Sequence, residues 1–257
     1  MGLRLGKAPA RIDDRTITLR SILKTLPPPP PYYMVDDGMP EKIPVSMLGN
    51  DSVGDCVIVA EDNHTLRFEC VEQSKCIDLT VDDALNQYYK EQGWKPSRCS
   101  CLSMWNPKPD NGLVMLDALN YWRQSGLVVG GYTYKIHAYA SALVESEIKQ
   151  CIYYLYGAEI GIALPASAMD QFNAGLPWDV TDEEFKNILG GHALYVVGYD
   201  EVFLYVLTWG RVQRMTWAFY HKYMDEAYGV VTARNIDSSS NPIDEDALEK
   251  KLAEITG

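Results

Sequence analysis

The sequence predicts an α+β protein made of two lobes, a helical lobe followed by a β-rich one. Residues 54–124 carry apolar side chains at helical spacing, whereas short apolar runs bounded by Gly, Pro or charged residues dominate from 128 to 233. Helices and strands are segregated along the chain, so a parallel sheet of alternating β-α-β units is not expected. The 257 residues, 47% of them hydrophobic, suffice for a sizeable core.

Four segments are predicted along the chain. Residues 1–44 form an arm in which five consecutive prolines, 27–31, favour extended geometry. The arm is either a ligand for an aromatic groove on a partner or a stiff spacer lying across its own domain. A helical lobe follows over 45–140 and a β-rich lobe over 141–236. The acidic tail, 237–257, is either a docked terminal helix or a partner-binding segment.

The predicted helices and strands follow from periodicity and from their end signals. Apolar spacing predicts helices over 54–74, 80–92, 113–124 and 144–156. Thr80 is expected to cap the second helix, because two aspartates follow in its first turn. Short apolar runs predict strands at 128–129, 132–134, 138–139, 158–164, 192–199, 203–208, 214–218 and 229–233.

Charge and composition exclude several classes of partner. The net charge of −12 argues against nucleic acid and against an anionic membrane surface, since both need a basic face. No apolar run is long enough for a signal peptide or a membrane span, so a cytoplasmic protein with six free thiols is expected. No cofactor is expected. A zinc site is not expected either, because neither cysteine pair of the one candidate group, Cys70, Cys76, Cys99 and Cys101, has the usual two-residue gap.

One cysteine and one histidine stand out as candidates for chemistry. Cys56 opens the predicted helix 54–74, where the helix dipole and free N–H groups favour a thiolate. A cysteine nucleophile also needs an imidazole to take its proton. His64 lies about 12 Å further along the same helix and about 80° around it, so a structural role is expected there. His192 begins an apolar strand after two glycines and is the better candidate.

These residues stand in segments that resemble the papain-like cysteine peptidase family. Residues 48–56 resemble the family's glutamine-to-cysteine segment, with Asn50 in place of the Gln. Residues 190–200 closely resemble its histidine strand, and 206–210 resemble the strand that ends in Asn-Ser-Trp-Gly. The resemblance covers 45–235 in the family's order. The chain is also similar to uncharacterised bacterial and bacteriophage proteins with Gly-Asp-Cys, Gly-Gly-His and Thr-Trp-Gly signatures.

The resemblance implies a papain-like fold with an active-site cleft between the helical lobe and a barrel-like lobe. It implies cleavage of peptide or amide bonds in a peptide or protein substrate, with Cys56 as nucleophile and His192 as proton carrier. The amide of Asn50 would hold the oxyanion together with the Cys56 N–H. Residues expected to touch substrate are Gly191, Trp209 and Trp178, with core packing an equal expectation for Trp178.

Two departures from the family pattern support an alternative. Aligned on Trp209, the family's orienting Asn falls at Leu207, whereas counting from His192 places it at Thr208, whose hydroxyl would orient the ring. Asp55 puts a carboxylate beside the thiol, and a like charge opposes thiolate formation, unless Asp55 caps the helix and points away. The alternative is a weak or inactive papain-fold subunit of a larger assembly, such as a bacteriophage particle, with the arm 1–44 and the tail 237–257 contacting its partners.

Overall fold

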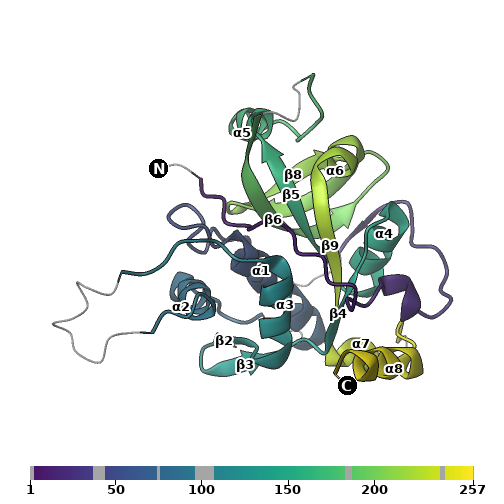
Figure 1. The fold of residues 1–257 in the computed structure, drawn as a ribbon. Helices are drawn as coiled ribbons and strands as arrows, with labels where there is room; N and C mark the ends of the chain where they lie inside the picture. Colours follow the sequence, from purple (N-terminus) through teal and green to yellow (C-terminus); the bar gives the residue numbers. More distant parts are fainter. Residues whose placement is uncertain are drawn as a thin grey trace.

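The helical part of the molecule packs against a large antiparallel sheet (Figure 1). The structure is a computed structural model that describes residues 3–36, 44–73, 76–95, 107–182, 187–237 and 241–256. The helical part contains three helices and one hairpin: α1 (Cys56–Gln73), α2 (Val81–Glu91), α3 (Met115–Gln124), β2 (Leu127–Val129) and β3 (Tyr132–Tyr134).

The sheet has seven strands, and every pairing in it is antiparallel. Six strands follow the order β4-β9-β5-β6-β7-β8, and β1 (Tyr33–Met34) pairs with the end of β6. β6 is central, and its last eight residues are buried. The six strands are β4 (Ala138–Ser141), β5 (Ala158–Pro165), β6 (Ile188–Tyr199), β7 (Phe203–Thr208), β8 (Arg211–Thr216) and β9 (Met224–Val231).

The four predicted helices are confirmed, and the α+β class with them. The fourth is α4 (Glu145–Tyr154), and Thr80 caps α2 by accepting a hydrogen bond from the Asp83 N–H at 3.2 Å. The sequence patterns did not predict four further helical segments: η1 (Leu19–Ser21), α5 (Ala166–Asn173), α6 (Trp217–Tyr223) and α7 (Ala233–Asp237).

Two predicted strands had wrong boundaries for local reasons. The strand expected at 214–218 is β8, which begins at Arg211 and ends where Thr216 caps α6 by accepting from the Phe219 N–H at 3.1 Å. Side-chain capping turns the chain into a helix there despite its aromatic content. The strand expected at 229–233 begins earlier, at Met224, and Ala233 already belongs to α7.

The described parts of the arm pack on the chain's own surface. Ile17, Leu19 and Ile22 are buried in the core. Two tyrosine hydroxyls hold the proline run, from Tyr154 to the Pro27 carbonyl at 2.8 Å and from Tyr199 to the Pro30 carbonyl at 2.7 Å. The proline run is therefore a spacer across its own domain.

The acidic tail also docks on the chain. It ends in α8 (Glu245–Thr256), preceded by Ile243, which is fully buried. The Asp244 N–H donates to the Ile22 carbonyl at 2.8 Å, which ties the tail to the arm, and Leu248 of α8 is buried at 1% exposure. Of the two expectations for this segment, the docked helix is the one observed.

The expectation of six free thiols was wrong for one pair. Cys70 near the end of α1 and Cys76 form a disulfide, and their Cα atoms lie 4.3 Å apart. Cys56 and Cys151 are free and buried, and the remaining two cysteines, Cys99 and Cys101, lie outside the described residues. The expectation that all cysteines are free, which was drawn from a cytoplasmic location, therefore fails for Cys70 and Cys76.

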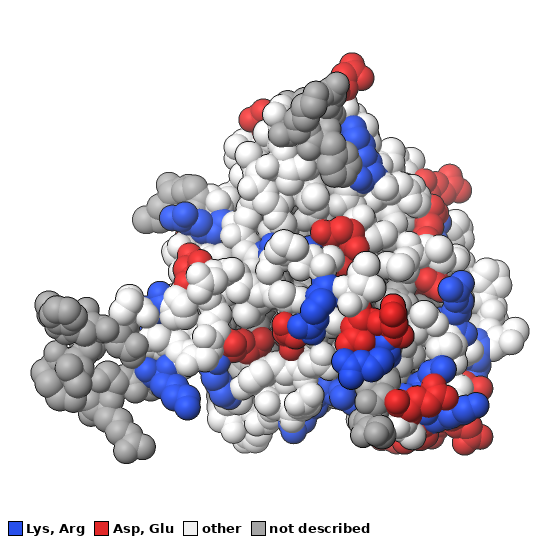
Figure 2. All heavy atoms as spheres, in the orientation of Figure 1, with Lys and Arg blue, Asp and Glu red and all other residues white. Residues whose placement is uncertain are grey.

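The molecular surface is mixed in charge on the face that Figure 2 shows, where acidic and basic side chains are interspersed. Every helix in the described ranges is too short or too polar to cross a membrane.

Candidate active site

Cys56 is the first residue of α1 and lies where that helix meets the sheet. The preceding turn carries left-handed backbone at Leu48 (φ 51°) and Gly49 (φ 106°), and the Asp55 carbonyl accepts the first bond of the helix from the Val59 N–H at 3.0 Å. The Cys56 Sγ accepts a hydrogen bond from the Ala193 N–H of β6 at 3.4 Å. Ala193 directly follows the predicted base, His192, so the thiol is bonded to the strand residue next to that base.

His192 is held on the sheet by a hydroxyl and an indole ring. Its Nε2 is 2.7 Å from Thr208 Oγ1, and its ring stacks on Trp209 with centroids 4.3 Å apart and planes at 14°. Trp209 and Gly210, at φ 43° and 73°, form the tight turn between β7 and β8, and both positive values match a type I′ hairpin. His192 Nδ1 is buried and has no hydrogen-bond partner among the described residues.

Of the two candidates for the orienting position, only Thr208 contacts His192. Thr208 points its hydroxyl at His192, while Leu207 is buried in the apolar core. The contact favours the count from the histidine, which gives Thr208 as the orienting residue. A hydroxyl accepts as well as donates, so it fits the Nε2–H tautomer that leaves Nδ1 as the base.

The N-terminal segment 4–8, here called the strap, runs between Gly191 of β6 and Leu113, which precedes α3 (the dark purple trace in Figure 1). Lys7 donates its N–H to the Gly191 carbonyl at 3.2 Å, on the sheet side. On the helical side, the Leu113 N–H donates to the Gly6 carbonyl at 2.8 Å, and the Ala8 N–H donates to the Leu113 carbonyl at 2.8 Å. The strap therefore bridges the two parts of the molecule as an added strand beside the thiol.

The front of the strap is tied down as closely. The Arg4 N–H donates to the Asn50 carbonyl at 3.1 Å, and the Trp209 Nε1–H donates to the Arg4 carbonyl at 3.2 Å. A Cβ built on Gly6 would lie 1.6 Å from the Gly54 carbonyl oxygen, so only glycine fits at this point of the strap.

Burial under the strap makes the Cys56–His192 pair neutral. Burial raises the pKa of the Cys56 thiol to about 11, although the backbone N–H groups of Ala193 and Gly6 oppose the rise by bonding the sulfur. Burial also lowers the pKa of His192 to about 3. At neutral pH both side chains are therefore uncharged, and the closed chain holds a thiol and not a thiolate.

Asp55 raises the pKa of the Cys56 thiol once it is ionised, as expected, but at neutral pH its carboxyl is mostly protonated. It is fully buried, and burial raises the pKa of its carboxyl to about 8, with the neighbouring Asn50 amide opposing the rise. The side chain thus carries a proton at neutral pH. Asn50, at 1% exposure, donates its Nδ2–H to the Val53 carbonyl at 3.2 Å.

Asp55→Asn should stabilise the protein increasingly as pH rises. Between pH 3.8 and about 8 the unfolded chain releases the Asp55 proton and the folded chain keeps it, so wild-type stability falls across that window. Asn at this position does not titrate. We expect the difference in Tm between variant and wild type to grow from pH 5 to pH 8.5, measured by calorimetry at both values. A pH-independent difference would contradict the protonated state of Asp55.

The other predicted residues divide between site and core. The carbonyl of Gly191 holds the strap, and Trp209 forms the wall behind His192. Trp178 lies one layer deeper, fully buried, with its Nε1–H on the Ala168 carbonyl at 2.8 Å, so it packs in the core and not at the cleft. His64 is structural as expected, buried with Nδ1 3.3 Å from Glu159 Oε1.

Sequence reasoning missed the strap as part of the site. Its residues carry no motif, and their main-chain partners, Asn50, Leu113 and Gly191, lie between 46 and 184 positions away in the chain. The available signal was glycine: Gly6, Gly54 and Gly191 all lack room for a Cβ because backbone from another segment passes within 3 Å.

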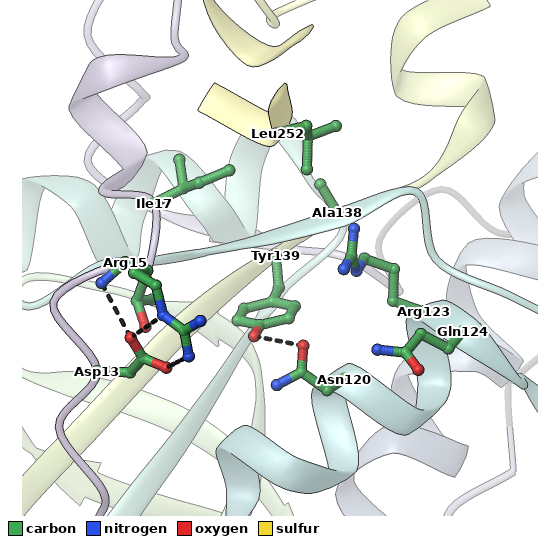
Figure 3. Close-up of a pocket in the computed structure, with 10 residues that line it drawn as sticks. Asp13, Arg15, Ile17, Asn120, Arg123, Gln124, Ala138, Tyr139 and Leu252 are labelled. Carbon is green, nitrogen blue, oxygen red and sulfur yellow. Dashed lines mark hydrogen bonds and ion pairs between the residues drawn. The ribbon is translucent and has the colours of Figure 1, made fainter. Parts of the chain in front are cut away.

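The hollow drawn in Figure 3 lies away from Cys56 and His192. It has a volume of about 400 Å³ and is lined by the arm, the end of α3, β4 and α8. Arg15 is paired with Asp13 at 2.7 Å, and the Tyr139 hydroxyl donates to Asn120 Oδ1 at 2.9 Å. The lining contains neither a thiol nor an imidazole, so it is not the site of thiol chemistry.

Comparison with known proteins places the fold. Neither a protein-family model nor a curated protein sequence matches the chain. Among solved structures, xylellain, a cysteine protease from Xylella fastidiosa, superposes with a TM-score of 0.65 and 17% identity over 90% of this chain and 97% of that one. A Carica candamarcensis cysteine protease gives 0.56 and 14% over 79% and 99%, and procathepsin B from Trypanosoma congolense gives 0.58 and 11% over 89% and 86%. The chain therefore has the papain-like α+β fold of these cysteine proteases.

Proposed function

We propose that the protein is a thiol hydrolase that cleaves peptide or amide bonds with Cys56 and His192. The geometry around His192 carries the proposal. Nε2 of His192 lies 2.7 Å from the Thr208 hydroxyl, and Nδ1 has no hydrogen-bond partner among the described residues. The next residue of the strand, Ala193, donates its N–H to the Cys56 sulfur. This is the nucleophile, base and orienting group of a catalytic triad, with a hydroxyl in the third place.

The chemistry proceeds by acyl transfer through the sulfur. His192 Nδ1 takes the thiol proton, the sulfur attacks the substrate carbonyl, and the imidazolium donates its Nε2–H to Thr208. The Cys56 N–H and the side-chain amide of Asn50 bind the oxyanion. The imidazolium then protonates the leaving amine, and water releases the acid from the thioester with His192 as base.

The closed chain is a latent form of this enzyme. A buried, neutral thiol and imidazole do not form an ion pair, and the strap occupies the space a substrate backbone would take. Displacing the strap returns water to both groups, so the pKa of Cys56 falls and that of His192 rises toward their ordinary values. The thiolate–imidazolium pair then forms near neutral pH.

The test uses the full chain with the strap displaced by Gly6→Val. A mixture of unstructured peptides is incubated with this variant and with Gly6→Val/Cys56→Ser, and products are identified by mass spectrometry. We expect cleavage products that depend on Cys56. Equal product in both proteins, or none in either, would reject peptide hydrolysis.

The alternative is a papain-fold subunit of a larger assembly, such as a bacteriophage particle. It is supported by the closed strap and by the neutral pair, which a protein without turnover would also keep. It predicts that Cys56 in the Gly6→Val chain is alkylated no faster than Cys151, the other buried free thiol.

A further inference from the structure

The side chain of Lys7 is buried in an acidic pocket beside the thiol. Only 1% of it is exposed, and its ammonium lies 2.9 Å from Asp225 Oδ2 and 3.0 Å from Glu226 Oε1. Lysine is almost never fully buried without a counter-charge, and here two carboxylates of consecutive residues supply it.

A β-bulge between β5 and β9 builds the pocket. Gly161 pairs with Glu226, but the next residue of β5, Ile162, pairs with Met224, so Asp225 is the extra residue. Consecutive residues of a regular strand point to opposite faces, whereas a bulge re-aims one of them. The bulge therefore lets both carboxylates reach the same cation.

The rest of the pocket is shaped for a long, cationic side chain. A Cβ on Gly161 would lie 2.1 Å from the Lys7 Cε, so the missing side chain is the space the lysine stem uses. The Tyr228 hydroxyl donates to Glu226 Oε2 at 3.0 Å and fixes that carboxylate, which is buried at 4% exposure. With the strap gone, the carboxylates of Asp225 and Glu226 face the position of Lys7.

The main-chain hydrogen bonds that hold the strap around Lys7 do not depend on which side chain the strap carries there. Gly191 and Leu113 hold the strap through main-chain N–H and C=O groups alone, which any extended peptide possesses. The Lys7 N–H donates to the Gly191 carbonyl, and Ala193, two residues further along β6, donates to the Cys56 sulfur at 3.4 Å, so the pocket lies close to the reacting atom. A peptide that adds as a strand here is selected by the side chain it places in the pocket.

We propose that the pocket formed by Gly161, Asp225 and Glu226 is a subsite for a lysine or arginine side chain of the substrate, which Lys7 fills in the closed chain. The inference rests on the proposed function and adds the substrate class: peptides and proteins with a basic residue close to the attacked bond. Lys7 thereby couples latency to specificity, since the strap and the substrate compete for the same two carboxylates.

Protection of Cys56 from alkylation tests the pocket without requiring turnover. The full chain carrying Gly6→Val is treated with iodoacetamide in the presence of a synthetic peptide of residues 3–12, or of the same peptide with norleucine or arginine in place of the lysine. We expect the lysine and arginine peptides to protect Cys56 at concentrations about tenfold lower than the norleucine peptide. Equal protection by the norleucine peptide would overturn the subsite.

The carboxylates are tested by substitution in the same chain. Asp225→Asn/Glu226→Gln should erase the difference between the lysine and norleucine peptides, whereas Glu201→Gln, at an exposed carboxylate outside the pocket, should preserve it. Retained selectivity in the double variant would overturn the assignment of these two residues.

A measurement with the strap in place does not depend on Gly6→Val. Lys7→Met should speed Cys56 alkylation several-fold and Lys7→Arg should not, because only the methionine loses the ion pairs that hold the strap. Lys7→Met combined with Glu226→Gln should change the rate by less than the product of the single effects. No effect of Lys7→Met would overturn the assignment of the pocket as a subsite.

The failure of the subsite and the failure of the proposed function can be told apart. Selective protection of Cys56 without peptide hydrolysis would reject only the proposed function. Peptide hydrolysis without selectivity for a basic residue would reject only the subsite.

Discussion

Gly6→Val is expected to raise the rate of Cys56 alkylation at pH 7.5 by about 100-fold or more over the wild-type chain. The valine Cβ would have to occupy a point 1.6 Å from the Gly54 carbonyl oxygen, which is main chain at the start of α1 and has little freedom to move. The strap must therefore leave, and its hydrogen bonds to Gly191 and Leu113 break with it.

The size of the effect follows from the thiolate population. A thiol with a pKa of about 11 is one-hundredth as ionised at neutral pH as one at the ordinary value of 9.0, and only the thiolate reacts with iodoacetamide. Release of the strap removes the burial that causes the shift and also admits the reagent. Proton transfer to His192 would lower the thiol pKa further and increase the rate beyond that factor.

A matched control separates displacement of the strap from general loosening. Ala10→Val adds bulk to the same arm at an exposed position, so Cys56 should remain as slow as in wild type. Cys151, buried between α4 and the sheet, should stay unreactive in both variants, as mass spectrometry of the alkylated peptides would show. Fast labelling of both cysteines in Gly6→Val would indicate unfolding, and slow labelling of Cys56 would mean that the strap does not close the site.

Sequence motifs predicted the residues that chemistry constrains. Cys56 and His192 were predicted because a nucleophile at a helix start and a histidine after two glycines need particular neighbours within a few residues. Two alignments gave two candidates for the orienting residue, Leu207 and Thr208. The strand that ends in the turn at Trp209 and Gly210 brings the Thr208 hydroxyl to His192. The helices of the first lobe were predicted for the same reason, since their apolar periodicity is local.

Contacts between distant segments were beyond such reasoning. Asp225 and Glu226 meet one ammonium only because a bulge shifts their strand against β5, and no pattern in either strand encodes that shift. The position of the strap depends on three segments that are adjacent only after folding. The carboxyl of Asp55 is charged or neutral according to its depth, which a neighbour in sequence does not reveal.

Within the Gly6→Val chain, His192→Ala should lower peptide hydrolysis by about 10³-fold or more, and Thr208→Val by about 10- to 100-fold. Alanine removes the base that takes the Cys56 proton and returns it to the leaving amine. Valine keeps the shape of threonine but leaves Nε2 of His192, which is buried, without its partner at 2.7 Å. The rates are compared with one fluorogenic peptide under conditions that give kcat and KM separately.

Thr208 acts through His192 and not on the substrate, so its loss has a signature that general destabilisation lacks. KM should stay near its original value while kcat falls, because no substrate contact is removed. The alkaline limb of the pH–rate profile should move to lower pH, since an imidazolium without an acceptor at Nε2 holds its proton less tightly. Thr208→Asn, which restores an acceptor oxygen, should recover most of kcat. An unchanged profile in Thr208→Val would mean that His192 is oriented by its stacking on Trp209 alone, and that the hydroxyl has no part in the reaction.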